Sequence, residues 1–354
     1  MIFLVYHHQK LRFPILLKSQ NTCLVQSKSP LKKVLESQIN CYIRNCPPLI
    51  KVEPDLTTSI GPIQLNKPVM LASGILGISL DVFNRLYRSG AGAVVTKSLS
   101  TEPWEGYPNP TIFSVKGGGW INAVGLSNPG AENFAKMIEP NKDVPIIVSL
   151  VGSIPEDFEK MIQQFENCKV AAYELNLSCP HVAKVGLEVG DDPELVKKIV
   201  STVKNSTNVP VIAKVGLGTT HYLNTVGTAI ESGIDAITAI NTVRAMAIDV
   251  ETQRPILSNK FGGLSGTPIK PIALRCVYEI SSKYDIPIIG CGGISTWEDA
   301  VEFFLAGASA IQLGSAIGDN WIDVFDEINT GILQYMEKKN YSKIKEMVGL
   351  AKKL

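Results

Sequence analysis

The residues best suited to chemistry lie where an apolar run stops, in the stretch Glu174–His181. The run ends in Asn176, and Cys179 follows just before Pro180, which cannot continue a strand ladder. A thiol has a pKa of about 8.5, and its deprotonated form can act as a general base. A free cysteine is more often a small buried hydrophobe, but a loop position beside a proline favours chemistry for Cys179.

Lysines and asparagines follow several other apolar runs. Lys97 and Lys214 each come at the end of such a run, where a lysine inside a barrel mouth needs an anionic or electron-rich partner. A substrate carboxylate or the pyrimidine edge of a flavin would suit them. Asn122, Asn176 and Asn241 each donate and accept hydrogen bonds, so together they could read a planar ring of carbonyl and N–H groups. Each asparagine taken alone is more often a turn former.

Glycines mark the last two apolar runs. Gly292-Gly293 and Gly314-Ser315 follow these runs and precede helical segments, a pattern that brings backbone N–H groups to a phosphate. The alternative is that they only form tight turns. Phe261–Gly266 is a third glycine-rich loop that could complete the cradle, whereas Val215–Thr220 lacks the third glycine of a dinucleotide fingerprint and is interpreted as a barrel loop.

These residues are positioned by a repeat of strand and helix. Eight apolar runs, each followed by a helical segment, predict a (β/α)8 TIM barrel in the α/β class. A hairpin at Leu56–Asn66 precedes the barrel, and long insertions at Ser98–Asp143 and Thr242–Thr267 are expected to be functional covers. The predicted strands are Val69–Ala72, Ala93–Thr96, Pro145–Leu150, Ala172–Leu175, Val211–Ala213, Ala236–Ala239, Ile286–Ile289 and Ala310–Leu313.

Composition excludes several classes of protein. The 354 residues carry a net charge of +1, which gives no electrostatic case for nucleic acid, and no apolar run reaches the roughly 18 residues of a membrane-spanning helix. Seven scattered cysteines without C-x-x-C pairs fit a reducing, cytoplasmic protein with neither disulfides nor a metal or iron–sulfur site in this chain. The four histidines offer few ligands for a His-ligated metal site.

Residues 1–50 differ from the remainder, residues 51–354, which we expect to form the catalytic barrel. They hold five Lys and two Arg against the single acidic residue Glu36. We favour a disordered basic leader, with a short helix from Ser29 through Ile43 as a local element. A membrane-touching or partner-binding appendage, and sequence removed from the mature protein, are the alternatives.

From Leu56 to the C-terminus the chain resembles the dihydroorotate dehydrogenases, specifically the class 1 branch that carries Cys as the base. The resemblance rests on many motifs in order: Leu71–Gly74, Val95–Ser98, Glu105–Pro110, Asn122–Leu126, Asn176–Pro180, Ile240–Thr242, Phe261–Gly266 and Gly290–Gly293. It implies a barrel with FMN in its mouth that oxidises (S)-dihydroorotate to orotate in pyrimidine synthesis.

Roles carried over from the family are as follows. Cys179 takes the C5 proton while hydride passes from C6 to flavin N5, and Lys97 acts beside it. The residues implied for orotate are Lys97, Asn122, Ala123, Val124, Gly125, Leu126, Asn176, Asn241 and Thr242. Those implied for FMN are Ala72, Ser73, Lys97, Ser98, Asn176, Lys214, Ile240, Gly266, Gly292, Gly293, Gly314 and Ser315. One departure is His181, where the family usually has Asn two residues after the cysteine.

The stretch Asn241–Arg244 and the sequence to Gly263 look most like the NAD-linked and archaeal members. The resemblance implies a homodimer core that works with an electron-transfer subunit as a heterotetramer, and FAD and an iron–sulfur cluster would then belong to that partner. The rival hypotheses are an FMN barrel acting on another dihydropyrimidine or on tRNA dihydrouridine, a flavin-free phosphate-binding isomerase or lyase, and a non-catalytic binding subunit. A tRNA enzyme is disfavoured because no basic face or RNA-binding domain is visible.

Overall fold

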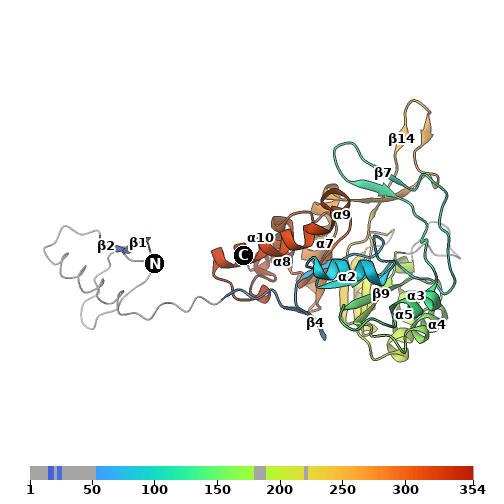
Figure 1. Ribbon diagram of the computed structural model, residues 1–354, viewed down its shortest axis with the longest axis horizontal. Helices are drawn as coiled ribbons and strands as arrows, with labels where there is room; N and C mark the ends of the chain where they lie inside the picture. The colour runs from blue at the N-terminus through green and yellow to red at the C-terminus, as the bar shows by residue number, and fades with distance from the viewer. Residues whose placement is uncertain (1–14, 20–21, 26–52, 179–188, 219–221, 354) are drawn as a thin grey trace. The chain divides into compact units, whose positions relative to one another are not determined.

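The computed structural model describes residues 15–19, 22–25, 53–178, 189–218 and 222–353 (Figure 1). The chain separates into two compact units, Met1–Glu53 and Pro54–Leu354. In the first unit, β1 (Ile15–Ser19) pairs antiparallel with β2 (Thr22–Val25). The helix predicted from Ser29 to Ile43 lies outside the described residues.

The second unit is a closed barrel of eight parallel strands, in the order β10-β11-β12-β17-β18-β5-β6-β9. The (β/α)8 fold predicted from the sequence is therefore confirmed, and each predicted strand is present. The strands are β5 (Val69–Leu71), β6 (Ala93–Val95), β9 (Ile146–Leu150), β10 (Ala172–Asn176), β11 (Val211–Val215), β12 (Ala236–Ala239), β17 (Ile288–Cys291) and β18 (Ala310–Leu313).

Three strands, β10, β11 and β17, run further than the sequence predicts. Asn176 is the last residue of β10 and Lys214 lies inside β11, because the two residues are partners in the parallel ladder and Lys214 also pairs with Thr238 of β12. The polar side chains of Asn176 and Lys214 therefore belong to rigid strands. This placement fixes their direction more firmly than a loop would.

Helices between the strands cover the barrel. They are α2 (Leu80–Arg88), α3 (Ala131–Ile138), α4 (Pro155–Gln164), α5 (Pro193–Ser206), α6 (Tyr222–Glu231), α7 (Lys270–Lys283), α8 (Trp297–Ala306), α9 (Ala316–Asn320) and α10 (Val324–Lys339). Short 3₁₀ turns are η1 (Val189–Asp191), η2 (Thr267–Ile269), η3 (Trp321–Asp323), η4 (Ile344–Glu346) and η5 (Leu350–Lys352). Local signals start the helices: Pro155 opens α4, and Thr296 and Asp299 form a capping box at α8.

The strand side chains alternate between two buried cores. Outward residues such as Val69 and Leu71 pack against the helices, whereas inward residues such as Met70, Ile147 and Ile212 fill the barrel. The hairpin of β3 (Thr58–Ile60) and β4 (Ile63–Leu65) adds Ile60, Ile63 and Leu65 to this inner core. The hairpin predicted ahead of the barrel thus packs into the barrel interior.

Further along the strands the inward layer becomes polar. Five buried polar residues each lie two positions after an inward apolar residue of the same strand: Ser149, Glu174, Lys214, Thr238 and Gln312. An apolar layer below a polar one is the arrangement expected where the upper layer forms the floor of a site.

The two insertions contribute one antiparallel sheet, in the order β13-β16-β8-β7. Its strands are β7 (Ile112–Ser114), β8 (Trp120–Asn122), β13 (Val243–Ala245) and β16 (Gly262–Ser265), and the two-residue strands β14 (Ile248–Asp249) and β15 (Arg254–Pro255) form a separate hairpin. Figure 1 shows β7 and β14 at the opposite end of the barrel unit from β4.

The prediction that Phe261–Gly266 is a glycine-rich loop is wrong in part. Gly262–Ser265 form strand β16, since the segment pairs with β8 on one side and β13 on the other. Only Gly266 and the turn η2 lead into α7. Within the described ranges, none of the helices has both the length and the apolar character needed to cross a bilayer.

Candidate active site

A cleft of about 480 Å³ opens among the carboxyl ends of the strands. Ligand sites in such barrels lie at this face. Residues predicted for the cofactor that line the cleft are Ala72, Ser73, Lys214, Ile240, Gly266, Gly292, Gly293, Gly314 and Ser315. Asn241 and Thr242, predicted for the substrate, line it as well.

One side of the cleft is a glycine cradle. Gly293 has a φ of +75°, and a Cβ built there would lie 2.6 Å from the Lys270 backbone nitrogen and 2.8 Å from the Gly266 carbonyl oxygen. The backbones of two segments, at Gly293 and across the turn from Gly266 to Lys270, therefore converge where no side chain fits. Such close backbone approach beside glycines is what a bound phosphate requires.

The floor of the cleft holds a buried cation. Lys214 Nζ donates to Gln312 Oε1 at 2.9 Å and lies 3.7 Å from Glu174 Oε1, with side-chain exposures of 6% for Lys214 and 0% for Glu174. Burial acts to lower the pKa of the Lys214 ammonium, but the nearby Glu174 carboxylate more than offsets it, so the pKa lies above its ordinary value. Lys214 is therefore a permanent positive charge at neutral pH.

A chain of hydrogen bonds joins predicted residues of different strands. Asn241 Nδ2 donates to Asn176 Oδ1 at 3.2 Å, and Asn176 Nδ2 donates to Ser98 Oγ at 3.1 Å. Ser98 Oγ in turn lies 3.3 Å from Ser73 Oγ and 3.0 Å from Ser149 Oγ. Asn176 and Ser98 do not line the cleft itself, but this chain connects them to Ser73 and Asn241, which do.

Lys97 follows β6, and its side chain is half-buried. Burial lowers the pKa of its ammonium. It does not line the cleft, although the next residue, Ser98, bonds to Ser73 at the cleft wall. A lysine whose charged form is disfavoured by burial would gain from an anionic ligand.

Asn122 ends β8 and faces the second insertion. Its Nδ2 donates to the Gly263 carbonyl oxygen at 3.4 Å, and a Cβ on Gly263 would come within 2.0 Å of Thr242 Oγ1. Asn122 and Thr242 therefore both lie against Gly263 of β16. The following residues, Ala123, Val124, Gly125 and Leu126, do not line the cleft.

Cys179 and His181 lie outside the described residues. Their predicted roles therefore stay predictions.

Three residues at the cleft floor were missed by the sequence reasoning. Gln312 and Cys291 line the cleft, and Glu174 lies behind them. Gln312 and Glu174 were detectable, because each is a polar residue inside an otherwise apolar strand. Burial raises the pKa of the Cys291 thiol, so it is neutral at neutral pH.

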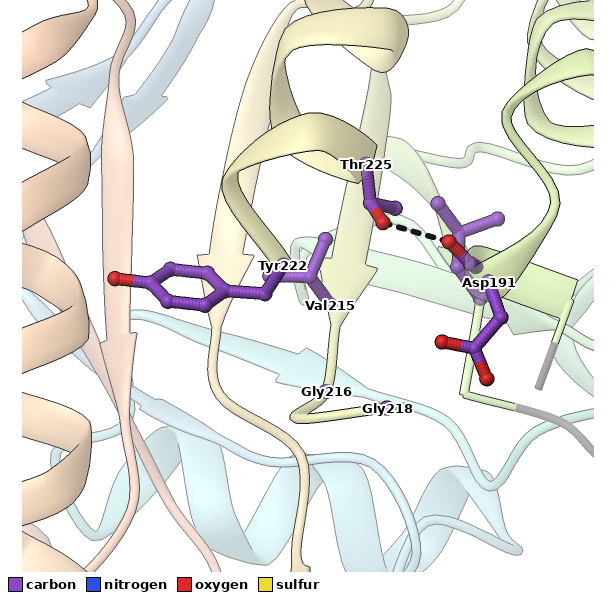
Figure 2. A pocket seen from close by; sticks show the side chains of 8 residues that line it. Asp191, Val215, Gly216, Gly218, Tyr222 and Thr225 are labelled. Carbon is purple, nitrogen blue, oxygen red and sulfur yellow. Dashed lines mark hydrogen bonds between the residues drawn. The ribbon is translucent and has the colours of Figure 1, made fainter. Parts of the chain in front are cut away.

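A second, smaller cavity of about 220 Å³ lies between the ends of β10 and β11, η1 and the start of α6 (Figure 2). Thr225 Oγ1 donates to the Gly190 carbonyl oxygen at 2.6 Å on one side, and Gly216 and Gly218, in the loop after β11, also line the cavity. Figure 2 shows the Tyr222 ring directed away from Asp191, and the Tyr222 hydroxyl donates to Glu279. None of the predicted site residues lines this cavity, so the larger cleft is the candidate site.

The family model described as dihydroorotate dehydrogenase matches residues 55–336. The chain belongs to the dihydroorotate dehydrogenase family. The matched segment starts just ahead of the β3–β4 hairpin and ends inside α10, so it contains the entire barrel.

Individual relatives agree with the family match. The chain is 50% identical over 293 residues to a protein of Pyrococcus furiosus named dihydroorotate dehydrogenase B (NAD(+)), catalytic subunit, covering 82% of this chain and 97% of the relative. Proteins of the same name are 48% identical in Pyrococcus abyssi, with 84% of this chain and 100% of the relative covered, and 47% identical in Methanothermobacter thermautotrophicus, with 84% and 98% covered.

Proposed function

We propose that this protein oxidises (S)-dihydroorotate to orotate with FMN as its cofactor, in the synthesis of pyrimidines. The observation that carries the proposal is the cleft itself, whose lining includes both a glycine cradle and the buried cation of Lys214. The phosphate of FMN would use the glycine cradle, and its flavin ring would use the cation. The names of the relatives supply the substrate.

The residues present fit FMN. Gly293 lies where a Cβ would clash with the backbone of Lys270 and Gly266, and with Gly266, Gly292, Gly314 and Ser315 it lines the cleft and offers backbone N–H groups for a phosphate. Lys214 offers an ammonium in the same cleft, suited to a ring that gains electrons. When bound, FMN supplies the acceptor for the hydride that leaves C6 of the substrate.

We propose that the substrate is held by the residues at the mouth of the cleft. Lys97 offers its ammonium to the substrate carboxylate, which would restore the charge that burial disfavours. Asn176 and Asn241 already orient one another, since the Asn176 Oδ1 accepts from Asn241 and leaves the two amides with defined directions. Asn122, Thr242 and the segment Ala123–Leu126 complete the contacts, and Cys179 takes the C5 proton.

We also propose an electron-transfer partner. The relatives are named NAD-linked catalytic subunits, and a catalytic subunit implies another chain. In the described part of this chain no group of three His, Cys, Asp or Glu side chains could hold a metal ion, so a cluster would come from the partner. A homodimer of this chain at the core of that assembly is part of the same proposal.

The test is the visible spectrum of the purified protein before and after anaerobic addition of dihydroorotate. We expect flavin absorbance that bleaches on addition. Dihydrouracil is the matched control, because it lacks the carboxylate assigned to Lys97 and should leave the absorbance unchanged. Flavin that stays oxidised with dihydroorotate, or bleaches equally with dihydrouracil, would refute the assigned substrate. A protein that stays colourless after added FMN would refute the cofactor.

A further inference from the structure

A buried carboxylate lies beneath the cleft without lining it. Glu174 points inward from β10 and is fully buried. Its Oε2 accepts from Thr238 Oγ1 at 2.9 Å and from Gln312 Nε2 at 2.7 Å. Its Oε1 is buried without a hydrogen-bond partner in the described part of the chain and lies 3.7 Å from Lys214 Nζ.

Glu174, Gln312 and Lys214 form a closed ring that admits one arrangement of the Gln312 amide. The Gln312 Oε1 accepts from the ammonium, and its Nε2 donates to the carboxylate. The reverse orientation would turn the amide N–H groups toward a cation and the carbonyl oxygen toward an anion. The carboxylate therefore fixes the polar face that Gln312 presents to the cleft.

Stability gives no sufficient reason for this ion pair. Burying two charges in a barrel interior costs several kcal/mol per ion before their attraction is counted, and apolar side chains of similar volume usually serve a core at least as well. Glu174 also reaches neither the cleft nor, by its position, a ligand in it. Its effect on a ligand must pass through Lys214 and Gln312, which do line the cleft.

We propose that Glu174 is a positioning residue that keeps Lys214 protonated and Gln312 oriented, so that the floor of the cleft presents a constant positive charge to a ring that accepts electrons. This inference rests on the proposed function, since an electron-accepting ring is the ligand that profits from such a charge.

Of the titratable groups that act on Lys214, Glu174 is the one that can keep it protonated. The titratable groups that act on Lys214 are Glu174 from β10 and Cys291 from β17, and its neighbour Gln312 from β18 is neutral. Burial raises the pKa of Cys291, so this thiol carries no charge at neutral pH to balance the ammonium. Without the Glu174 carboxylate, desolvation is the dominant influence left, and it lowers the pKa of a lysine.

The test replaces the carboxylate by the amide of the same shape, Glu174→Gln, and measures the midpoint potential of the bound flavin against pH. In the parent we expect one proton to accompany two electrons throughout, because Lys214 stays charged. In Glu174→Gln we expect a break between about pH 6 and about pH 10. Above this break the slope of the midpoint potential against pH doubles, since reduction then draws a second proton onto Lys214 Nζ. Thr238→Val removes a donor to the same carboxylate without removing its charge, and should show no break.

Identical pH dependence in Glu174→Gln and the parent would overturn the proposal and leave Glu174 a purely structural group. This outcome is distinct from failure of the proposed function, which is judged by whether dihydroorotate bleaches the flavin. A flavin that is bound but not reduced by dihydroorotate still reports the potential.

Heat denaturation of the apoprotein tests the same idea without flavin. In Glu174→Gln the folded pKa of Lys214 falls below its unfolded value, so the unfolded state binds more protons and stability rises with pH. The gap in melting temperature between parent and variant should therefore narrow as pH rises. The double variant Glu174→Gln/Lys214→Met, which buries no charge, should be more stable than Glu174→Gln and lose this trend. A gap of constant size, or a double variant no more stable than the single one, would refute the proposal, and the double variant remains measurable if Glu174→Gln does not fold.

Discussion

Replacing Gly293 by alanine tests the glycine cradle directly. A Cβ at this position would lie 2.6 Å from the Lys270 nitrogen, 2.7 Å from the Lys270 Cβ and 2.8 Å from the Gly266 oxygen, two of them backbone atoms that cannot rotate away. The φ of +75° adds strain for any residue with a side chain. Strain of this kind costs roughly 1–3 kcal/mol and overpacking a further 1–3 kcal/mol.

The sum, about 2–6 kcal/mol, corresponds to a fall in melting temperature of about 4–12 °C, at about 2 °C per kcal/mol for a unit of this size. Two other glycines separate the contributions. A Cβ on Gly314, in the same cleft, would meet only the Ala72 Cβ at 3.7 Å, an ordinary contact, and Gly74 has a φ of +100° with nothing within 4 Å. Gly74→Ala therefore reports strain without a clash.

Thermal denaturation of the three apoproteins, followed by titration with FMN, is the assay. We expect the loss of stability to rank Gly293→Ala above Gly74→Ala and Gly74→Ala above Gly314→Ala. We also expect FMN affinity in Gly293→Ala to fall at least tenfold, because the Lys270 and Gly266 backbones must move apart. A melting temperature for Gly293→Ala no lower than that of Gly314→Ala would refute the reasoning, as would unchanged FMN affinity.

Three further outcomes are expected. Because burial lowers the pKa of Lys97, the KM for dihydroorotate should rise with pH on the alkaline side as the ammonium loses its proton. Lys97→Met should have a high KM without that trend. A KM in the parent that is flat to about pH 10 would show that Lys97 does not bind the substrate carboxylate. Cys179→Ala should retain FMN but lose turnover by about 10²–10⁴-fold, and Cys179→Ser should keep weak activity that rises with pH, whereas an unchanged pH profile would contradict its role as base. Deleting residues 1–45 should leave FMN binding intact, and loss of flavin would show that the leader supports the barrel.

Much of the fold is legible in the chain. Each strand of the barrel is an apolar run in which inward and outward residues are both buried, so the runs stand out without an alignment, and their number closes the barrel. Gly292-Gly293 after β17 and Gly314-Ser315 after β18 stand out in the sequence because each follows an apolar run, and both line the cleft, whereas their role in holding a phosphate stays a prediction. β16 was misread as a loop because Gly262 and Gly263 have weak strand propensity, and pairing with β8 and β13 on both sides overrode it.

The sequence by itself determined the strand order along the chain, the eightfold repeat and the types of residue that end each strand, because these depend on local periodicity. Tertiary structure decided which polar residues meet. Lys214 and Gln312 are far apart in sequence, yet β11 and β18 bring them to one hydrogen bond above Glu174. No local pattern predicts this ring, because inward-pointing side chains from different strands share a layer only after the sheet has closed with a particular stagger.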